Sequence, residues 1–459
     1  MKKRVSKDLR TIKFGTDGVR GRFNKDLRAD DALRLGLAHG AGLRSATSGP
    51  GRPKVVVGRD SRVSGDALLG AYGAGLMSCG VDVIDLGVIP TPAVAFAVKE
   101  LSADGGAMLS ASHNPVPDNG IKLFGPKGKK LSDTQARELE KRFDNSENLE
   151  LADSVKVGRF SRNEGLKASY RRFLLQNLEG SLEGMKIVLD CAHGAASEHA
   201  RAVFERAGAQ VVMLCDSPDG EKINVECGST HLGLLKARVV EIGAHLGFAF
   251  DGDADRCLAV SDTGEAISGD QMMVIVAGEL HKQGRLVGDR IVLTVMSNLG
   301  AELALKGMGI EVTRTKVGDR YVFEEMEKSG AILGGEQSGH ILLLDRHWSG
   351  DGMMAGLVFA GLVKSLNKPV SELLGAIPEM PQTLVNVSGV DKSRLESDVA
   401  VRDAIKSAEE KLGEKGRLLV RPSGTEPLIR LMAEGPEQAI LDSVLDELKS
   451  VVEARLAVQ

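Results

Sequence analysis

The chain of 459 residues is too long for one hydrophobic core, so three or four domains are expected. A hydrophobic content of 42%, a charged content of 27% and a formal net charge of −4 are typical of a soluble globular protein. They exclude a chain-wide basic surface for nucleic acid or anionic membrane, and no run approaches the roughly 18 apolar residues that span a bilayer.

The five cysteines are widely spaced, and no two of them form a C-x-x-C pair. This pattern argues against a disulfide scaffold or a structural zinc site and fits a reducing compartment. The basic first residues are not followed by an apolar segment, so no secretory signal is expected. We therefore expect a cytoplasmic protein.

A repeated order of elements precedes Asn367. Short apolar runs open three similar stretches, at residues 54–58, 186–190 and 290–294. A helical pattern follows each run and ends at a glycine, where a second run starts, at residues 80–84, 208–213 and 309–313. After another helical pattern come the third runs, at residues 106–109, 247–250 and 331–333. This order predicts three βαβαβ units with mostly parallel sheets.

Polar loops follow the third run of each unit, at residues 110–115, 251–256 and 335–340. Because ligands gather beyond the carboxyl ends of parallel strands, these loops are the expected site. No P-loop or dinucleotide fingerprint occurs, which argues against kinases of that class and against NAD enzymes.

The chain after Asn367 has a different order of predicted elements, with apolar runs at residues 384–388, 416–420 and 428–434 and two helical patterns. This predicts a separate α+β domain with a small antiparallel sheet. The predicted fold class is thus α/β, with three similar units and this C-terminal domain. The expected boundaries are residues 1–160, 161–263, 264–372 and 373–459.

Asp251, Asp253 and Asp255 directly follow an apolar run. Three carboxylates this close repel one another unless a cation lies among them, and their hard oxygen atoms suit Mg²⁺. The alternative is a solvated acidic turn. An EF-hand is excluded, because Arg256 and Asp262 occupy its glycine and glutamate positions.

Ser112 lies in a loop with His113, and a serine in such a loop is usually a turn residue. Adjacent serine and histidine are weak evidence for a hydrolase, and no G-x-S-x-G motif occurs. Ser112 nevertheless shares the expected strand-end site with the three aspartates. A phosphorylated Ser112 would supply the anionic oxygen that a tri-aspartate Mg²⁺ site lacks.

Two more loops offer ligand-binding groups. The hydroxyls of Ser423 and Thr425, the backbone around Gly424, and Arg421 with Arg430 can surround a phosphate, although an ordinary turn between strands is the alternative. Glu336, Ser338 and His340 suit sugar hydroxyls or a phosphate. A glycine-rich turn near the start carries Arg20.

Five motifs resemble the α-D-phosphohexomutase superfamily, in family order and over essentially the whole chain. They are FGTDGVRG (14–21), SASHNP (110–115), DGDADR (251–256), GEQSGH (335–340) and RPSGTEP (421–427). Ala254 stands where many members have glycine. The resemblance implies four domains around one central cleft, and closure of the last domain over bound ligand.

The resemblance also implies site roles. Ser112 would be the phosphoserine, and Mg²⁺ would be held by Asp251, Asp253, Asp255 and the Ser112 phosphate. The implied catalytic residues beside Ser112 are Arg20, Lys122, His113 and His340. The implied substrate-binding residues are Glu336, Ser338, Arg421, Ser423, Gly424, Thr425 and Arg430.

Further motifs at residues 190–195 and 218–231 imply a small hexosamine phosphate as substrate. Phosphate would move between its 6- and 1-positions through a 1,6-bisphosphate, feeding UDP-N-acetylglucosamine and cell-wall precursor synthesis. The implied activator is glucosamine 1,6-bisphosphate or glucose 1,6-bisphosphate, and a homodimer is suggested. The alternatives are a mutase for glucose or mannose phosphates, a hydrolase with Asp251 as nucleophile, and a non-catalytic sugar-phosphate sensor.

Overall fold

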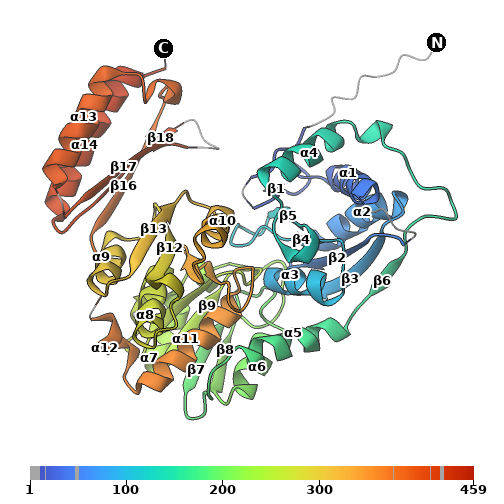
Figure 1. Ribbon diagram of the computed structural model, residues 1–459, viewed down its shortest axis with the longest axis horizontal. Coiled ribbons are helices and arrows are strands. Elements are labelled where there is room, and N and C mark those ends of the chain that lie inside the picture. Colours follow the sequence, from blue (N-terminus) through green and yellow to red (C-terminus); the bar gives the residue numbers. More distant parts are fainter. Residues whose placement is uncertain are drawn as a thin grey trace.

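The computed structural model describes residues 11–15, 17–46, 51–375, 377–413, 415–423 and 428–458. Figure 1 shows three α/β units and a C-terminal unit that lies to one side of them. Within the described residues, none of the helices is long and apolar enough to cross a membrane.

The first unit contains β1 (Val19–Arg22), α1 (Ala29–Ala46), β2 (Lys54–Arg59), α2 (Gly65–Ser78), β3 (Asp82–Val88), α3 (Thr91–Glu100), β4 (Gly105–Leu109), β5 (Asp118–Phe124), α4 (Asp133–Asp144) and β6 (Phe160–Arg162). The second contains α5 (Gly165–Gln176), β7 (Lys186–Asp190), α6 (Ala200–Arg206), β8 (Gln210–Leu214), α7 (Gly233–Ile242), β9 (Leu246–Phe250), β10 (Cys257–Ser261) and β11 (Ala266–Ile267).

The third unit contains α8 (Gly269–Lys282), β12 (Arg290–Thr294), α9 (Leu299–Gly307), β13 (Glu311–Thr315), α10 (Asp319–Ser329), β14 (Leu333–Gly335), β15 (Ile341–Leu343), α11 (Gly352–Leu366) and α12 (Val370–Leu374). The C-terminal unit contains β16 (Gln382–Ser388), α13 (Val399–Leu412), β17 (Arg417–Pro422), β18 (Leu428–Glu434) and α14 (Gln438–Leu456).

The predicted threefold βαβαβ plan is confirmed, with the same strand order in each unit. The first strand of each βαβαβ repeat (β2, β7 and β12) lies between the second and third strands of that repeat and pairs in parallel with both. Four predicted strands begin two residues later than expected, since the runs expected from residues 80, 208, 309 and 331 start at Asp82, Gln210, Glu311 and Leu333. Gly330 ends α10 in the left-handed conformation, and the chain needs the next residues to turn into the sheet.

Each third strand is followed by an antiparallel strand that sequence reasoning missed. β5 pairs with β4, β10 with β9, and β15 with β14. The three polar loops are therefore the connections of three hairpin-like pairs, all at the carboxyl ends of third strands. This topology presents the loops of all three units in equivalent positions, as the strand-end rule requires.

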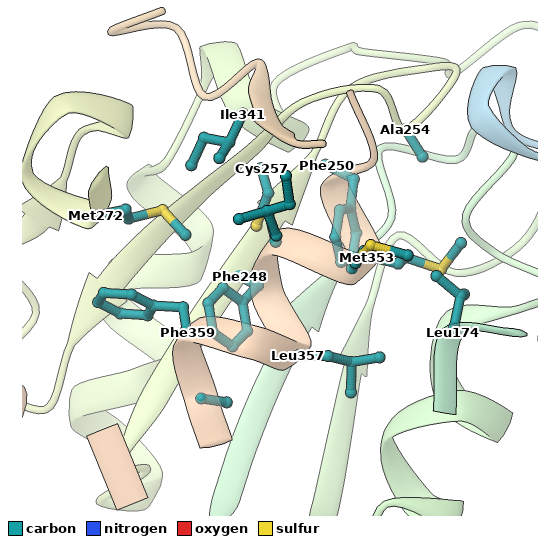
Figure 2. Packing of buried hydrophobic residues seen from close by; sticks show 14 of the residues in the cluster. Leu174, Phe248, Phe250, Ala254, Cys257, Met272, Ile341, Met353, Leu357 and Phe359 are labelled. Atoms are coloured by element: carbon teal, nitrogen blue, oxygen red, sulfur yellow. The ribbon is translucent and has the colours of Figure 1, made fainter. Parts of the chain in front are cut away.

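The first three units share one continuous hydrophobic core. Its members run from Val56 in the first sheet, through Phe248 in the second, to Leu333 in the third. Figure 2 shows α11 of the third unit packing against the second sheet, where the rings of Phe248 and Phe359 lie 6.4 Å apart at their centroids. Each large apolar side chain buried here contributes about 1.5–3 kcal/mol, so the three units are held as one body.

The C-terminal unit has a core of its own. Its sheet has the order β16-β18-β17, all antiparallel, and α13 and α14 supply most of the remaining apolar side chains. It meets the third unit at a polar joint, where Arg417 donates to the Ser297 carbonyl at 3.0 Å and Asn298 donates to the Met380 carbonyl at 2.9 Å. The predicted α+β domain is thus a separate folding unit.

Candidate active site

The loop after β4 places the Ser112 hydroxyl against the loop after β9. Ser112 is only 1% exposed, and its Oγ donates to Asp251 Oδ2 at 2.5 Å. The Nδ1 atom of His113 lies 3.2 Å from the same Oγ. The backbone of Ser112 has a φ of 54°, an uncommon value for a residue with a side chain. A tightly held loop therefore aims this hydroxyl across the boundary between two units.

A buried arginine holds that loop in place. Arg62 is 3% exposed, and its Nε lies 3.0 Å from Asp60 Oδ2. Its guanidinium also donates at 3.1 Å or less to four backbone carbonyls, those of Ser112 (3.1 Å), Asn114 (2.7 Å), Pro115 (2.6 Å) and Asp118 (2.8 Å), and at 3.4 Å to that of Val116. Because the planar fork satisfies so many acceptors at fixed angles, it fixes the loop rather than merely neutralising a charge.

Asp251, Asp253 and Asp255 form a compact buried set. One carboxylate oxygen from each lies within 4.8 Å of the others. Gly252 allows this packing, because a Cβ there would lie 2.7 Å from the Ser112 carbonyl oxygen. Oδ1 of Asp253 is buried and accepts no hydrogen bond from the residues that the structure describes. Three buried acids with such an orphaned oxygen fit a hard cation such as Mg²⁺.

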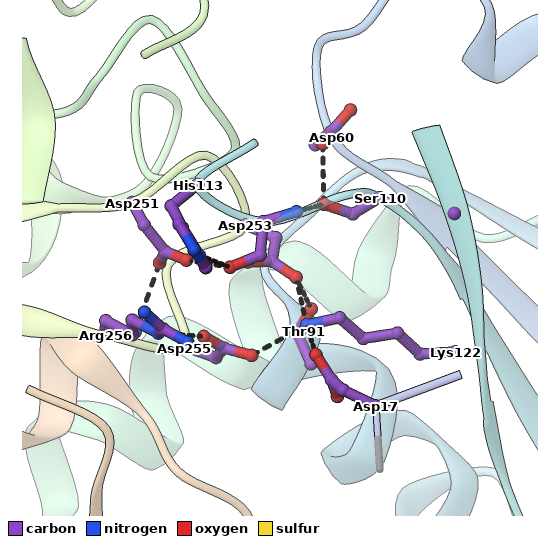
Figure 3. A network of polar contacts seen from close by, with 12 residues as sticks. Asp17, Asp60, Thr91, Ser110, His113, Lys122, Asp251, Asp253, Asp255 and Arg256 are labelled. Atoms are coloured by element: carbon purple, nitrogen blue, oxygen red, sulfur yellow. Dashed lines mark hydrogen bonds and ion pairs between the residues drawn. The ribbon is translucent and has the colours of Figure 1, made fainter. Parts of the chain in front are cut away.

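Lys122 on β5 joins the first unit to the acids of the second (Figure 3). Its Nζ lies 2.7 Å from Asp253 Oδ2, 2.8 Å from Asp255 Oδ2 and 3.0 Å from Asp17 Oδ2. Thr91, at the start of α3, donates its hydroxyl to Asp253 Oδ2 at 2.5 Å. The carboxylates are therefore oriented from the first unit before any ligand arrives.

The acids and the lysine differ in the direction of their pKa shifts. Burial, followed by the charges of Asp255 and Asp253, raises the pKa of Asp251 well above its usual value. Burial also opposes the charge on Asp255, but Lys122 and then His340 outweigh it and hold the pKa of Asp255 well below normal. Burial likewise opposes the charge on Lys122, yet Asp17, Asp253 and Asp255 together raise its pKa well above normal. Asp251 is thus the acid that gains most from a bound cation.

Arg20 and Lys130 extend this network at the rim of the first unit. Arg20 pairs with Asp17, and Lys130 pairs with both Asp17 and Asp319. Burial opposes the charge on Arg20, but Asp17 and then Asp253 raise the pKa of Arg20. Burial also opposes the charge on Lys130, but Asp17 and then Asp319 raise the pKa of Lys130, so both side chains carry positive charge beside Asp17.

His340 brings the third unit to the same place. Its Nδ1 lies 3.5 Å from Asp255 Oδ1, and its Nε2 lies 3.2 Å from Asp319 Oδ2. Burial lowers the pKa of His340, but Asp319 and Asp255 outweigh burial and raise it. His113 behaves oppositely, because burial and then Arg256 and Arg20 lower its pKa to about 4. The two histidines beside the acids thus hold their protons with very different strengths.

The other residues of the third loop face the same region with polar atoms. Glu336 Oε1 accepts from the Gly318 backbone at 2.9 Å, and its charge contributes to the raised pKa of Arg256. Oγ of Ser338 is buried and has no hydrogen-bond partner among the described residues. This hydroxyl is available to a polar ligand.

The C-terminal residues form a second group. Arg421 on β17 and Arg430 on β18 are directly opposite one another in the sheet. Burial, followed by the charge of Arg430, lowers the pKa of Arg421. Ser423 directly follows the last residue of β17 and is buried. Gly424 and Thr425 lie outside the described residues.

Several residues of this network were missed by sequence reasoning. They are Asp17, Asp60, Arg62, Thr91, Lys130, Asn224 and Asp319. Asp17 lies within the FGTDGVRG motif and could have been selected on that ground. Asn224 lies within the motif at residues 218–231, which indicated only the substrate class. The others stand in stretches whose local sequence resembles ordinary turns and helix starts, and only the tertiary fold brings them to the site.

Models of four domains match the chain in order. The phosphoglucomutase/phosphomannomutase alpha/beta/alpha domain I matches residues 11–150, domain II matches residues 168–264 and domain III matches residues 268–380. The C-terminal domain model matches residues 384–451.

Curated relatives are similar over nearly their whole length. A phosphoglucosamine mutase of Carboxydothermus hydrogenoformans is 48% identical over 441 residues, covering 96% of this chain and 99% of the relative. One of Thermobifida fusca is 47% identical over 445 residues, covering 97% and 99%.

Solved structures share the fold. A phosphoglucomutase/phosphomannomutase family protein from Burkholderia thailandensis has a TM-score of 0.81 and 27% identity, covering 96% of this chain and 97% of its own. An Aspergillus fumigatus N-acetylphosphoglucosamine mutase, solved with GlcNAc-6P and magnesium, has a TM-score of 0.69, covering 97% and 96%. At 17% identity, the latter supports the fold alone.

Proposed function

Because the chain belongs to the phosphoglucomutase/phosphomannomutase family, we propose that it interconverts glucosamine 6-phosphate and glucosamine 1-phosphate through a phosphoserine at Ser112. The observation that carries the chemistry is the 2.5 Å contact between Ser112 Oγ and Asp251 within a buried acidic set. The choice of amino sugar rests on the near-full-length similarity to phosphoglucosamine mutases.

Asp251, Asp253 and Asp255, together with the phosphate on Ser112, are the residues that would hold Mg²⁺. The ion, when bound, supplies positive charge that offsets the charge developing on a transferring phosphoryl group. Thr91 and Lys122 keep Asp253 oriented for this role through contacts of 2.5 and 2.7 Å.

The transfer follows from the position of Ser112. A sugar hydroxyl attacks the phosphorus, a new O–P bond forms, and the bond to Ser112 Oγ breaks to give a 1,6-bisphosphate. The bisphosphate reorients in the site so that its other phosphate faces Ser112. Ser112 Oγ then attacks that phosphate, and the bond between its phosphorus and the sugar oxygen breaks. We assign charge stabilisation to Arg20 and Lys122, and proton exchange at the reacting oxygens to His340 and His113, because these groups line the same network.

Substrate contacts divide between two units. We assign the sugar hydroxyls to Glu336 and Ser338, where the buried Ser338 hydroxyl lacks a hydrogen-bond partner among the described residues. We assign the non-reacting phosphate to Arg421, Ser423 and Arg430, with Gly424 and Thr425 of the same loop. Two guanidinium groups in register across β17 and β18 favour a dianion between them.

The remaining proposals concern the setting of this reaction. We propose domain boundaries after residues 160, 263 and 372, glucosamine 1,6-bisphosphate or glucose 1,6-bisphosphate as activator, a cytoplasmic location and a homodimer. The substrate is a small hexosamine phosphate rather than a nucleic acid or a membrane.

Substrate choice is tested by comparing kcat/KM for glucosamine 6-phosphate, glucose 6-phosphate and mannose 6-phosphate. Phosphate on Ser112 is measured on the same sample, so that an unphosphorylated preparation is not mistaken for an inactive one. We expect the highest value for glucosamine 6-phosphate. A clear preference for glucose or mannose phosphate would overturn the choice of substrate while leaving the Ser112 chemistry intact.

A further inference from the structure

A second group of potential metal ligands lies in the second unit, away from the three aspartates. His193 follows β7, Cys215 follows β8, and Cys227 lies in the loop before α7. A ring nitrogen and the two Sγ atoms all lie within 4.8 Å of one another. Cys227 is 1% exposed, and the other two side chains are partly buried. Three separate segments thus bring soft donor atoms to one point.

The hydrogen bonds of His193 prepare it for such a role. Its Nδ1 lies 2.9 Å from the Ser217 carbonyl oxygen, and a carbonyl can only accept a hydrogen bond. In the neutral imidazole the proton is therefore on Nδ1, and the lone pair is on Nε2. A backbone carbonyl that fixes the tautomer in this way is the usual partner of a metal-binding histidine.

The backbone around the cluster is equally constrained. His193 and Cys215 have φ values of 52° and 47°, in the left-handed region. The His193 N–H donates to the Cys215 carbonyl at 2.8 Å, which ties the two strand ends together. Such conformations persist only where the surrounding structure determines them, so the backbone of His193 and Cys215 is held in this arrangement before any ion binds.

We propose that His193, Cys215 and Cys227 bind a thiophilic divalent cation such as Zn²⁺, at a site independent of the Asp251–Asp255 set. Two thiolates and an imidazole are preferred ligands for Zn²⁺, whereas Mg²⁺ prefers oxygen. Binding converts the two thiols to thiolates and releases two protons, and a water molecule completes four-coordination.

The position of the cluster gives the ion a structural role. Asn224 lies between Cys215 and Cys227 in the chain, and its Nδ2 donates to the Ser112 carbonyl at 2.8 Å. Ala195, two residues after His193, donates its N–H to the Gly252 carbonyl at 2.8 Å. An ion that joins these segments would stabilise the two segments that contact the Ser112 loop and the aspartate loop.

The test is zinc binding to the full-length protein, kept reduced and saturated with Mg²⁺ so that the aspartate site is filled. Wild type, Cys215→Ser and Cys227→Ser are titrated with Zn²⁺ against a competing chelator, with Cys79→Ser as the control for loss of a buried thiol elsewhere. We expect one tight zinc equivalent in wild type and in the control, and an affinity at least about tenfold weaker in the two cluster variants. Co²⁺ in place of Zn²⁺ should give a sulfur-to-metal charge-transfer band, which oxygen ligands alone do not produce.

Circular dichroism of each variant shows whether it is folded. His193→Gln, which alters a partly exposed side chain, serves if a cysteine variant fails to fold, and it should also weaken zinc binding at least about tenfold. Equal zinc affinity in wild type and the folded variants would overturn the proposal, as would the absence of the thiolate band. Recovery of Cys215 and Cys227 as a disulfide that persists under reducing conditions would overturn it as well.

Discussion

The first three units and the C-terminal unit differ in how their residues are held in place. In the first three units a shared hydrophobic core and a buried network of opposite charges hold Ser112, Lys122 and the acids in fixed positions. The C-terminal unit has its own core and touches the third unit at a polar joint. The difference teaches that the residues around Ser112 are positioned by one continuous core, whereas the C-terminal unit is attached to it through polar contacts.

The charges differ in the same way. Lys122 is surrounded by carboxylates, so this buried cation has its opposite charges within the protein. Arg421 faces Arg430 across two strands, so like charges lie opposite one another in the C-terminal unit. A bound dianion would relieve that repulsion, and this is why we proposed these two arginines for the phosphate that does not react.

The largest effect is expected from Asp253→Asn, which removes a charge from the acidic set. We expect kcat to fall by at least about 10³-fold, because the ion that offsets the transferring charge is lost. Chelation of Mg²⁺ should inactivate the wild type similarly, and added Mg²⁺ should restore the wild type but not the variant. Steady-state kinetics check both, and a variant with near-normal kcat would contradict the metal assignment.

The second largest fall in kcat is expected from a change at Arg62, which holds the Ser112 loop in place. Arg62→Lys keeps the charge but cannot satisfy four carbonyls and Asp60, so the Ser112 loop should shift. We expect kcat to fall about 10²-fold with little change in KM. Arg59→Lys, which alters a neighbouring arginine paired with Asp85 at 3.2 Å, is the matched control. An equal loss in both variants would show a general loss of stability instead.

A smaller effect is expected in the C-terminal unit. Arg421→Ala removes one charged hydrogen-bond donor for phosphate, so KM should rise about 10-fold or more while kcat changes little. Phosphate on Ser112 should stay at the wild-type level, since the first three units are untouched. Arg402→Ala, at an exposed position of α13, is the control. An unchanged KM for Arg421→Ala would contradict the assignment of phosphate binding to this unit.

The smallest effect concerns stability at low pH, which should fall more in the first three units than in the C-terminal unit. Burial lowers the pKa of His39 and His347 to about 4 and that of His199 to about 3, and no histidine follows residue 347. The unfolded chain binds protons at these histidines near pH 6.5 but the folded protein does not, so stability falls as the pH drops from about 6.5 towards 4.

The single tryptophan, Trp348, reports on this because it belongs to the third unit. The urea midpoint followed by its fluorescence should fall between pH 7 and pH 5, while hydrogen exchange in β16–β18 should change less. His347→Gln should remove part of the fall. A pH-independent midpoint would contradict the burial of neutral histidines.

Much of the fold follows from the sequence, and part of the site does not. The strands β2, β7 and β12 and the polar loops were predicted because continuous apolar runs end abruptly in polar residues. β5 was missed, since Lys122 interrupts its buried run and its partner charges come from another unit. Arg62 and Thr91 act through contacts with residues distant in sequence, which no local pattern indicates. The cysteines near His193 looked unrelated for the same reason, as their spacing matches no known metal motif.

The central claim is that Ser112 carries the phosphoryl group, and single-turnover transfer tests it most directly. Protein with phosphate located on Ser112 by tandem mass spectrometry is mixed with equimolar glucosamine 6-phosphate and Mg²⁺. We predict that Ser112 transiently loses its phosphate as an equal amount of glucosamine 1,6-bisphosphate appears, that phosphate returns to Ser112 as glucosamine 1-phosphate forms, and that Ser112→Ala neither carries phosphate nor turns over. Phosphate found on Asp251, or turnover by Ser112→Ala at the wild-type rate, would contradict the account.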